Sequence, residues 1–213
     1  VLDALKETYG INVSDIDYQL LKSMPRVLRD ANWKVTAAIW DDREVFSLEK
    51  GDTSEEAYGI AVDIGTSKII ISLSNLVNGQ IVTTESAENP QIKHGEDVIS
   101  RISYALKSEA HLKEMQQAVT TCLNNMISEA CRKPGLNSKQ IYELTVVGNT
   151  AMHHLFLGIQ PKHLGLSPYV PGVSDPVNEK AKNLRLKVNP AANVHVFPVI
   201  AGFVGGDAVA DII

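Results

Sequence analysis

One acid and several small hydrogen-bond donors lie between two apolar runs in the sequence AVDIGTSKII, residues 61–70. Gly65 gives the backbone the freedom that a tight turn needs, and Thr66 and Ser67 supply hydroxyl and N–H donors at its tip. Asp63 precedes them with a carboxylate. The sequence therefore gathers groups suited to polar or ionic chemistry at one turn.

The elements that must position this turn are strands. Residues 58–64 and 68–76 are rich in Ile, Val and Leu, which predicts a strand on each side of it. Asn78-Gly79 predicts a hairpin, so a third strand over 80–84 should fold back antiparallel. Together they predict a three-stranded meander with Asp63 at one tip.

A second polar group follows an expected strand over 141–147. Gly148, Asn149 and Thr150 stand where this strand turns into a short helix, GNTAMHHLFLG. The free N–H groups and the dipole at a helix start favour an anion or a polar partner. The alternative is that Thr150 only caps the helix.

A third polar group lies near the end of the sequence. Gly202, Gly205, Gly206 and Asp207 stand between an expected strand over 194–200 and a helix that begins at Asp207. Asp207 is a candidate for contacting a metal ion or an attacking water. The alternative is that it caps this last helix.

His153 and His154 suggest a metal site at first sight. Adjacent helical residues point about 100° apart, and no acid lies at a useful spacing, so ligation is disfavoured. We expect one of the two to be packed and the other to lie on the surface.

The polar residues after the meander also have two interpretations. Asn89, Gln91, Glu96, Asp97 and Arg101 form a polar cluster in the sequence. A helix whose first turn holds Glu96 and Asp97, with Arg101 paired to Asp97 four residues on, explains much of it without a ligand. A functional role remains the alternative.

The expected domains are a small α/β unit with its linker, residues 1–56, and a larger α/β unit, residues 57–213. The first is predicted from helices over 1–9, from Ser14 or Asp15 through Leu21, and over 25–31, then strands over 33–40 and 44–48. The second continues after the meander with a helix from 96, a longer helix over 112–130, and the elements named above. Between 158 and 193, with five prolines, we expect an irregular excursion with at most one short strand near 184–188.

Composition limits the function classes. At 213 residues and 44% hydrophobic, the chain can bury a core, and its net charge of −5 disfavours binding to nucleic acid or to anionic membrane. It contains no apolar run of about 20 residues for a membrane span, so a cytoplasmic setting is expected. Cys122 and Cys131 are the only cysteines, too few to hold an iron–sulfur cluster.

The element order, together with VDIGTSKIIISL, resembles a ribonuclease-H-like half of the actin, sugar-kinase and heat-shock-chaperone ATPase superfamily. The resemblance implies that the first turn meets the phosphates of ATP. Asp63 would then organise Mg²⁺ through water, and Gly65, Thr66 and Ser67 would contact phosphate. It also brings Gly148, Asn149 and Thr150 to the nucleotide cleft.

Longer stretches resemble the reductive activators of corrinoid proteins. They are ENPQIKHGEDVISRI, ELTVVGNTAMHHLFLGI, LSPYVPG, FPVIAGFVGGDAVADII and, in the first unit, LLKSMPRVLRDANWKVTAAIWDDREVFSLEKGD. The resemblance implies ATP-driven electron transfer from an iron–sulfur cluster to the Co(II) form of a corrinoid methyl carrier, which restores Co(I). Its partners would be the corrinoid protein and a low-potential electron donor.

The sequence departs from that family in lacking a cysteine cluster and a second Asp-x-Gly phosphate motif. We therefore expect the cluster in a separate N-terminal domain, the ATPase domain to be incomplete here, and this piece alone to be inactive. Two alternatives stay open: another ATPase or small-molecule kinase of the superfamily, or a non-catalytic module that docks a corrinoid protein or forms a homodimer.

Overall fold

The computed structural model describes residues 1–211. The chain divides into two compact units, which meet in the sequence between Ala57 and Tyr58. The predicted boundary lies one residue earlier. Each unit has its own sheet and its own core.

The first unit is a three-stranded sheet with two helices. Its elements are α1 (Leu2–Tyr9), β1 (Asp15–Ile16), α2 (Tyr18–Asp30), β2 (Val35–Trp40) and β3 (Glu44–Lys50). The strand order is β1-β3-β2, with β1 parallel and β2 antiparallel to β3. A small core around Leu20, Val45 and Leu48 holds the helices to the sheet.

Two helices were predicted where the structure has one, α2. Its N-cap is Asp17, whose carboxylate accepts the N–H groups of Gln19 and Leu20, whereas Ser14 or Asp15 was expected. Pro25 lies inside the helix and does not begin a new one. Proline removes one helical hydrogen bond, but Met24 and Val27, on either side of it, pack against the core and stabilise a continuous helix.

The second unit is built on a six-stranded mixed sheet of order β6-β5-β4-β7-β9-β8. Its strands are β4 (Tyr58–Ile64), β5 (Lys68–Asn75), β6 (Ile81–Glu88), β7 (Ile141–Gly148), β8 (Val177–Lys180) and β9 (Asn193–Val196). The meander β4-β5-β6 is antiparallel, as predicted. Strands β7 and β9 then run parallel to β4, which requires the helical crossovers between them.

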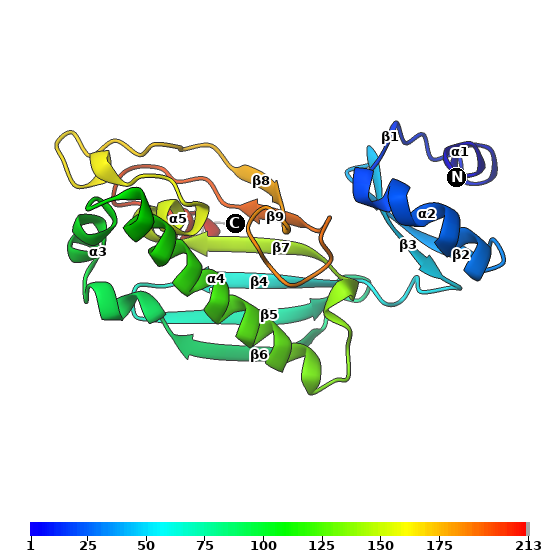
Figure 1. Cartoon of the computed structure of the whole chain (residues 1–213), viewed down its shortest axis with the longest axis horizontal. Helices are drawn as coiled ribbons and strands as arrows, with labels where there is room; N and C mark the ends of the chain where they lie inside the picture. Colours follow the sequence, from blue (N-terminus) through cyan, green and yellow to red (C-terminus); the bar gives the residue numbers. More distant parts are fainter. Residues whose placement is uncertain (212–213) are drawn as a thin grey trace. The chain divides into compact units, whose positions relative to one another are not determined.

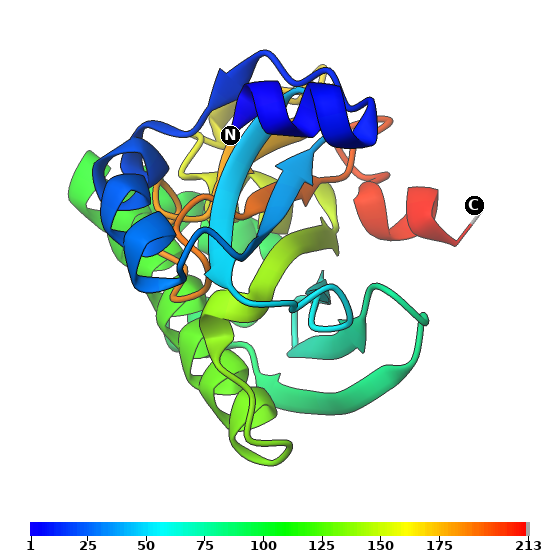
Figure 2. The same ribbon diagram turned by 90° about the vertical axis from the view of Figure 1, so that its right-hand side faces the viewer.

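The helices of this unit lie on both faces of the sheet. They are the α-helices α3 (Val98–Ala105), α4 (Glu109–Arg132), α5 (Thr150–Leu157) and α6 (Gly206–Ala210), and the 3₁₀ helices η1 (Pro90–His94), η2 (Ser138–Gln140) and η3 (Lys162–Leu164). Figure 2 shows α4 and α6 on opposite sides of the sheet. Within residues 1–211, no helix has both the length and the apolar character that crossing a bilayer requires.

Alternation along β4 sets which face of the sheet is core. Ile60, Val62 and Ile64 are buried in the cluster that includes Met115 and Val119 of α4. Successive strand residues point to opposite faces, so the acid between Val62 and Ile64 lies on the other face, where it is exposed. The same alternation therefore builds the core and presents the carboxylate.

The excursion after α5 differs from its prediction. The strand lies at Val177–Lys180, antiparallel to β9, and residues 184–188 are turn and bend. Leu184, Leu186 and Val188 are nevertheless buried in the main core. Arg185 has a left-handed φ of 59°, which a strand does not accommodate. The apolar residues of 184–188 therefore indicated that the segment is buried, but they did not indicate that it is a strand.

Candidate functional site

The predicted site residues meet at one edge of the six-stranded sheet. Because β4 and β7 are parallel neighbours, their carboxyl ends lie side by side, with Ile64 opposite Gly148. The turn of residues 65–67, here called the β4–β5 turn, follows the first strand, and α5 follows the second. Figure 1 shows both at the left-hand edge of the sheet.

Asn149 joins the two predicted groups directly. Its Nδ2 donates to the Thr66 hydroxyl oxygen at 3.0 Å. Its Oδ1 accepts the N–H groups of Ala151 and Met152 at 3.1 Å, which makes it the N-cap of α5. One side chain therefore starts the helix and holds the β4–β5 turn.

Thr150 does not cap the helix, so the structural alternative for this residue is wrong. Its hydroxyl donates to the Ala201 carbonyl at 2.7 Å. That bond ties α5 to the segment that follows β9, which leads into α6. The third predicted group is thereby brought to the same edge.

Three glycines permit the close packing of these segments. A Cβ on Gly148 would lie 2.8 Å from the Ile64 carbonyl oxygen, and one on Gly65 would lie 2.7 Å from the Lys68 carbonyl oxygen. A Cβ on Gly205 would lie 2.5 Å from the Gly148 carbonyl oxygen. All three obstacles are backbone, so a larger residue at any of these positions must move a strand end or the turn.

The acids near this edge form a negative region. Although Asp63 is exposed as a residue, partial desolvation of its carboxyl raises the pKa, and the charges of Asp207 and Asp211 raise this pKa further. Mutual repulsion among carboxylates favours a bound cation. Asp211 was not anticipated; its spacing of four residues from Asp207 on the last helix was the available signal.

Asp207 lies within the first turn of α6 and is not its N-cap, which is Gly205. Its Oδ1 accepts the N–H of Ala208 at 2.9 Å. Across the described residues 1–211, no cluster of three His, Cys, Asp or Glu side chains could by itself hold a metal ion. A cation at this edge would therefore need oxygens from a ligand or from water.

Both histidines of α5 are buried, so the expectation that one lies on the surface is wrong. Nε2 of His154 accepts the Gly172 N–H at 2.9 Å, so its proton resides on Nδ1, which donates to the Thr150 carbonyl at 2.8 Å. Burial, and secondly the neighbouring histidine, lowers the pKa of His153 to about 4. His154 thus joins α5, which Asn149 caps, to the loop at Gly172.

The predicted ion pair between Arg101 and Asp97 is also wrong. Asp97 is the N-cap of α3, and Glu96 lies before the helix. The Arg101 side chain is wholly buried, with Nε donating to the Gly95 carbonyl at 2.9 Å and Nη1 3.4 Å from the Met152 sulfur. Burial lowers the pKa of Arg101. Asn89, Gln91 and Arg101 of this cluster are therefore buried, and Asn89 and Arg101 reach Met152 of α5, whereas Glu96 and Asp97 stay exposed.

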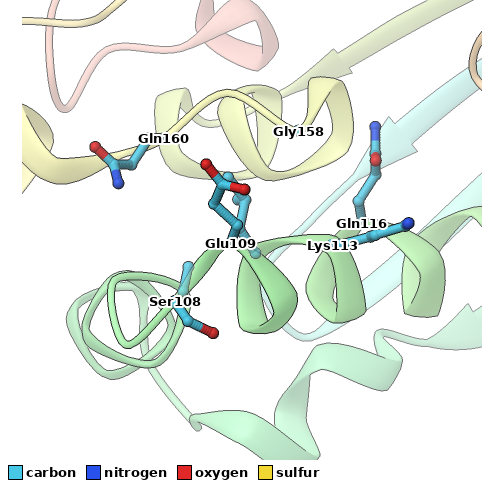
Figure 3. A pocket seen from close by; sticks show the side chains of 8 residues that line it. Ser108, Glu109, Lys113, Gln116, Gly158 and Gln160 are labelled. Atoms are coloured by element: carbon cyan, nitrogen blue, oxygen red, sulfur yellow. The ribbon is translucent and has the colours of Figure 1, made fainter.

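A separate surface hollow of about 500 Å³ lies at the far end of α5. Glu109, Lys113 and Gln116 of α4, Gly158, which ends α5, and Gln160 are among the residues that line it (Figure 3). Lys113 would attract phosphate, but the carbonyl end of α5 and the Glu109 carboxylate repel it, and none of the predicted nucleotide-binding residues line the hollow. We therefore assign no nucleotide to this hollow.

Comparison with known proteins supports the same division of the chain. A family described as the RACo linker region matches residues 1–55, and one described as the RACo middle region matches residues 58–213. The second match covers most of the chain. This chain belongs to the RACo family.

Two relatives extend this assignment. The chain is 32% identical over 210 residues to the corrinoid activation enzyme RamQ of Eubacterium limosum, covering 98% of this chain and 35% of the relative. Among solved structures, a reductive activator for corrinoid,iron-sulfur protein matches with a TM-score of 0.86 and 31% identity, over 99% of this chain and 34% of that one. The chain thus spans about a third of the length of these relatives, and the predicted fold class is confirmed.

For this RACo-family chain, the sequence did not reveal that Asn89 contacts the β4–β5 turn. Asn89 was one member of a polar cluster with two interpretations, yet it contacts the β4–β5 turn directly, with Nδ2 2.8 Å from the Gly65 carbonyl oxygen. The available signal was its place at the end of β6, whose last residue pairs with Lys68 just after the turn.

Proposed function

We propose that the protein to which this linker and middle region belong uses ATP and Mg²⁺ to drive reductive activation of a corrinoid protein. Its cobalt substrate would pass from Co(II) to Co(I). Electrons would come from a low-potential donor through an iron–sulfur cluster held outside this chain. RACo membership and the names of both relatives support the corrinoid part of the proposal.

The observation that carries the ATP part is the meeting of the β4–β5 turn with the start of α5 beside Asp63. The turn and the start of α5 supply hydroxyl and N–H donors, and Asp63 supplies a carboxylate of raised pKa two residues before the turn. Phosphate oxygens suit the donors, and the attached divalent cation suits the acids. The residues present therefore fit a magnesium nucleotide.

Each residue has a distinct proposed role. Gly65, Thr66 and Ser67 would bind phosphate through backbone and hydroxyl donors, and the start of α5 at Gly148, Asn149 and Thr150 would add its dipole. Asp63 would hold water on Mg²⁺, with Asp207 adding negative charge. When bound, ATP would supply the free energy that biases the protein toward the state able to reduce cobalt.

The test uses the intact protein, purified without oxygen and mixed with a Co(II) corrinoid protein and a low-potential donor. The cobalt absorption bands are followed with and without Mg-ATP. We expect ATP-dependent loss of the Co(II) bands, abolished by Asp63→Asn. Asp175→Asn is the matched control, because it removes an exposed carboxylate from another loop of the same unit.

Two outcomes would separate the alternatives. ATP binding without any effect on cobalt, across several corrinoid partners, would indicate another ATPase or kinase of the same fold. Binding of the corrinoid protein with no binding of nucleotide would indicate a docking module.

A further inference from the structure

Asn89 makes two hydrogen bonds to the β4–β5 turn from the end of β6. Its side-chain Nδ2 donates to the Gly65 carbonyl at 2.8 Å, and its backbone N–H donates to the Ser67 carbonyl at 2.9 Å. The residue is completely buried. The inner side of the turn is thus held by one asparagine that lies more than twenty residues further along the chain.

The first of these bonds fixes which way a peptide group faces. The Gly65-Thr66 peptide is trans, since the only cis peptide among the described residues precedes Pro168. In a trans peptide the carbonyl and the following N–H point in opposite directions. Holding the Gly65 carbonyl toward Asn89 therefore turns the Thr66 N–H away from the protein interior.

Asn89 is itself held firmly. Its Oδ1 accepts the Gln91 N–H at 2.9 Å, and the Gln91 side chain donates to the Met115 carbonyl of α4 at 3.1 Å. Its Nδ2 also lies 3.7 Å from the Met152 sulfur, which the buried guanidinium of Arg101 contacts as well. The asparagine is thus anchored to α4 and α5 before it reaches the turn.

We infer that Asn89 is a positioning residue that aims the Thr66 N–H at the phosphates of the bound nucleotide. This inference rests on the proposed function. Asn149 holds the same turn through the Thr66 side chain, whereas Asn89 acts on its backbone. Without Asn89 the Gly65 peptide can rotate, and the N–H is then no longer preorganised for an anion.

The test compares two buried asparagines whose side chains make the same kinds of hydrogen bond. Asn89→Ser keeps an oxygen that can accept the Gln91 N–H but cannot reach Gly65. Asn189 is the matched control, because its Oδ1 also accepts an N–H two residues on and its Nδ2 also donates to a distant carbonyl, that of Lys139. Lys139 precedes β7, at the opposite edge of the sheet.

The intact protein is titrated with Mg-ATP and, separately, with adenosine, and its unfolding by urea is measured. We expect Asn89→Ser to weaken ATP binding roughly tenfold, the effect of one lost hydrogen bond to a charged ligand, with adenosine affinity changed less than about twofold. Asn189→Ser should leave both affinities unchanged while costing similar stability. Asn89→Ala, which removes the donor without burying a charge, is the second variant if the serine variant does not fold.

Each outcome has a distinct meaning. Equal losses for ATP and adenosine, or wild-type ATP affinity in a folded Asn89 variant, would overturn the positioning role and leave the proposed function intact. Wild-type protein that does not bind Mg-ATP would overturn both. A selective loss for ATP alone, absent in Asn189→Ser, supports the inference.

Discussion

The two turns of the meander are built in opposite ways. The turn between β5 and β6 is held by its own side chains: Asn75 Oδ1 accepts the N–H groups of Val77 and Asn78, and Asn78 Oδ1 accepts that of Gln80. The β4–β5 turn is held instead by Asn89 and Asn149, which come from later parts of the chain.

This difference distinguishes a turn that is complete in itself from the turn that we propose binds phosphate. In the outer turn, local side chains occupy the backbone donors. In the β4–β5 turn, the distant residues Asn89 and Asn149 hold two carbonyls and a hydroxyl, and the remaining donors can face a ligand. A preorganised site costs less free energy to order when the ligand arrives.

The largest expected difference between the two turn regions comes from adding one methyl group to a glycine in each. Gly148→Ala places a Cβ 2.8 Å from the Ile64 carbonyl oxygen and must push β4 and β7 apart. We expect it to lower the free energy of unfolding by about 3 kcal/mol. Gly79→Ala meets nothing within 4 Å but has a φ of +73°, so it should cost only about 1 kcal/mol. Urea unfolding measures both, and equal costs would contradict the comparison.

Acid should lower the free energy of unfolding because it protonates His153 in α5, the helix that begins at the site. The pKa of His153 is lowered to about 4 in the folded protein, so its contribution is complete above the unfolded pKa of about 6.5 and is lost as the pH falls toward 4. We expect stability to fall by about 2–3 kcal/mol over that window from this residue alone. His153→Gln, which does not titrate, should flatten that part of the stability profile. An unchanged slope in the variant would show that other groups cause it.

Removing one asparagine from each turn gives a smaller contrast. Asn149→Ala deletes the N-cap of α5 and the bond to Thr66, and should cost about 1–2 kcal/mol. Asn78→Ala deletes one exposed bond and should cost less than about 0.5 kcal/mol. Thermal unfolding of both variants checks this, and a larger cost at Asn78 would reverse our interpretation of the two turns.

The smallest expected effect has the opposite sign. Because the folded pKa of Asp63 is raised, its ionisation destabilises the protein above that pKa, and this cost disappears below the unfolded value near 3.8. Asp63→Asn should therefore raise stability at about pH 7 by less than about 1 kcal/mol, since the group is solvent-screened, and leave it unchanged at about pH 3. Reduced stability at neutral pH would mean that its charge is favourably paired.

Local chemistry explains which elements could be predicted. The alternation of apolar residues gives the bounds of β4, and Asn78-Gly79 gives the antiparallel meander. A glycine of left-handed φ, Gly10, gives the end of α1. Each of these signals acts within a few residues, so the sequence displays it directly. The strand at Val177–Lys180 escaped prediction because only its pairing with β9 makes it a strand.

The sequence by itself determined that a polar turn with Asp63 at its entrance follows a buried strand, since period-two alternation needs no partner to be recognised. Only the tertiary structure decided that Asn89 and Asn149 both hold that turn and that the buried Arg101 side chain donates to the Gly95 carbonyl. The physical reason is that a side-chain amide or guanidinium bonds whichever acceptor the packed backbone brings within about 3 Å, and sequence separation does not indicate which one that is.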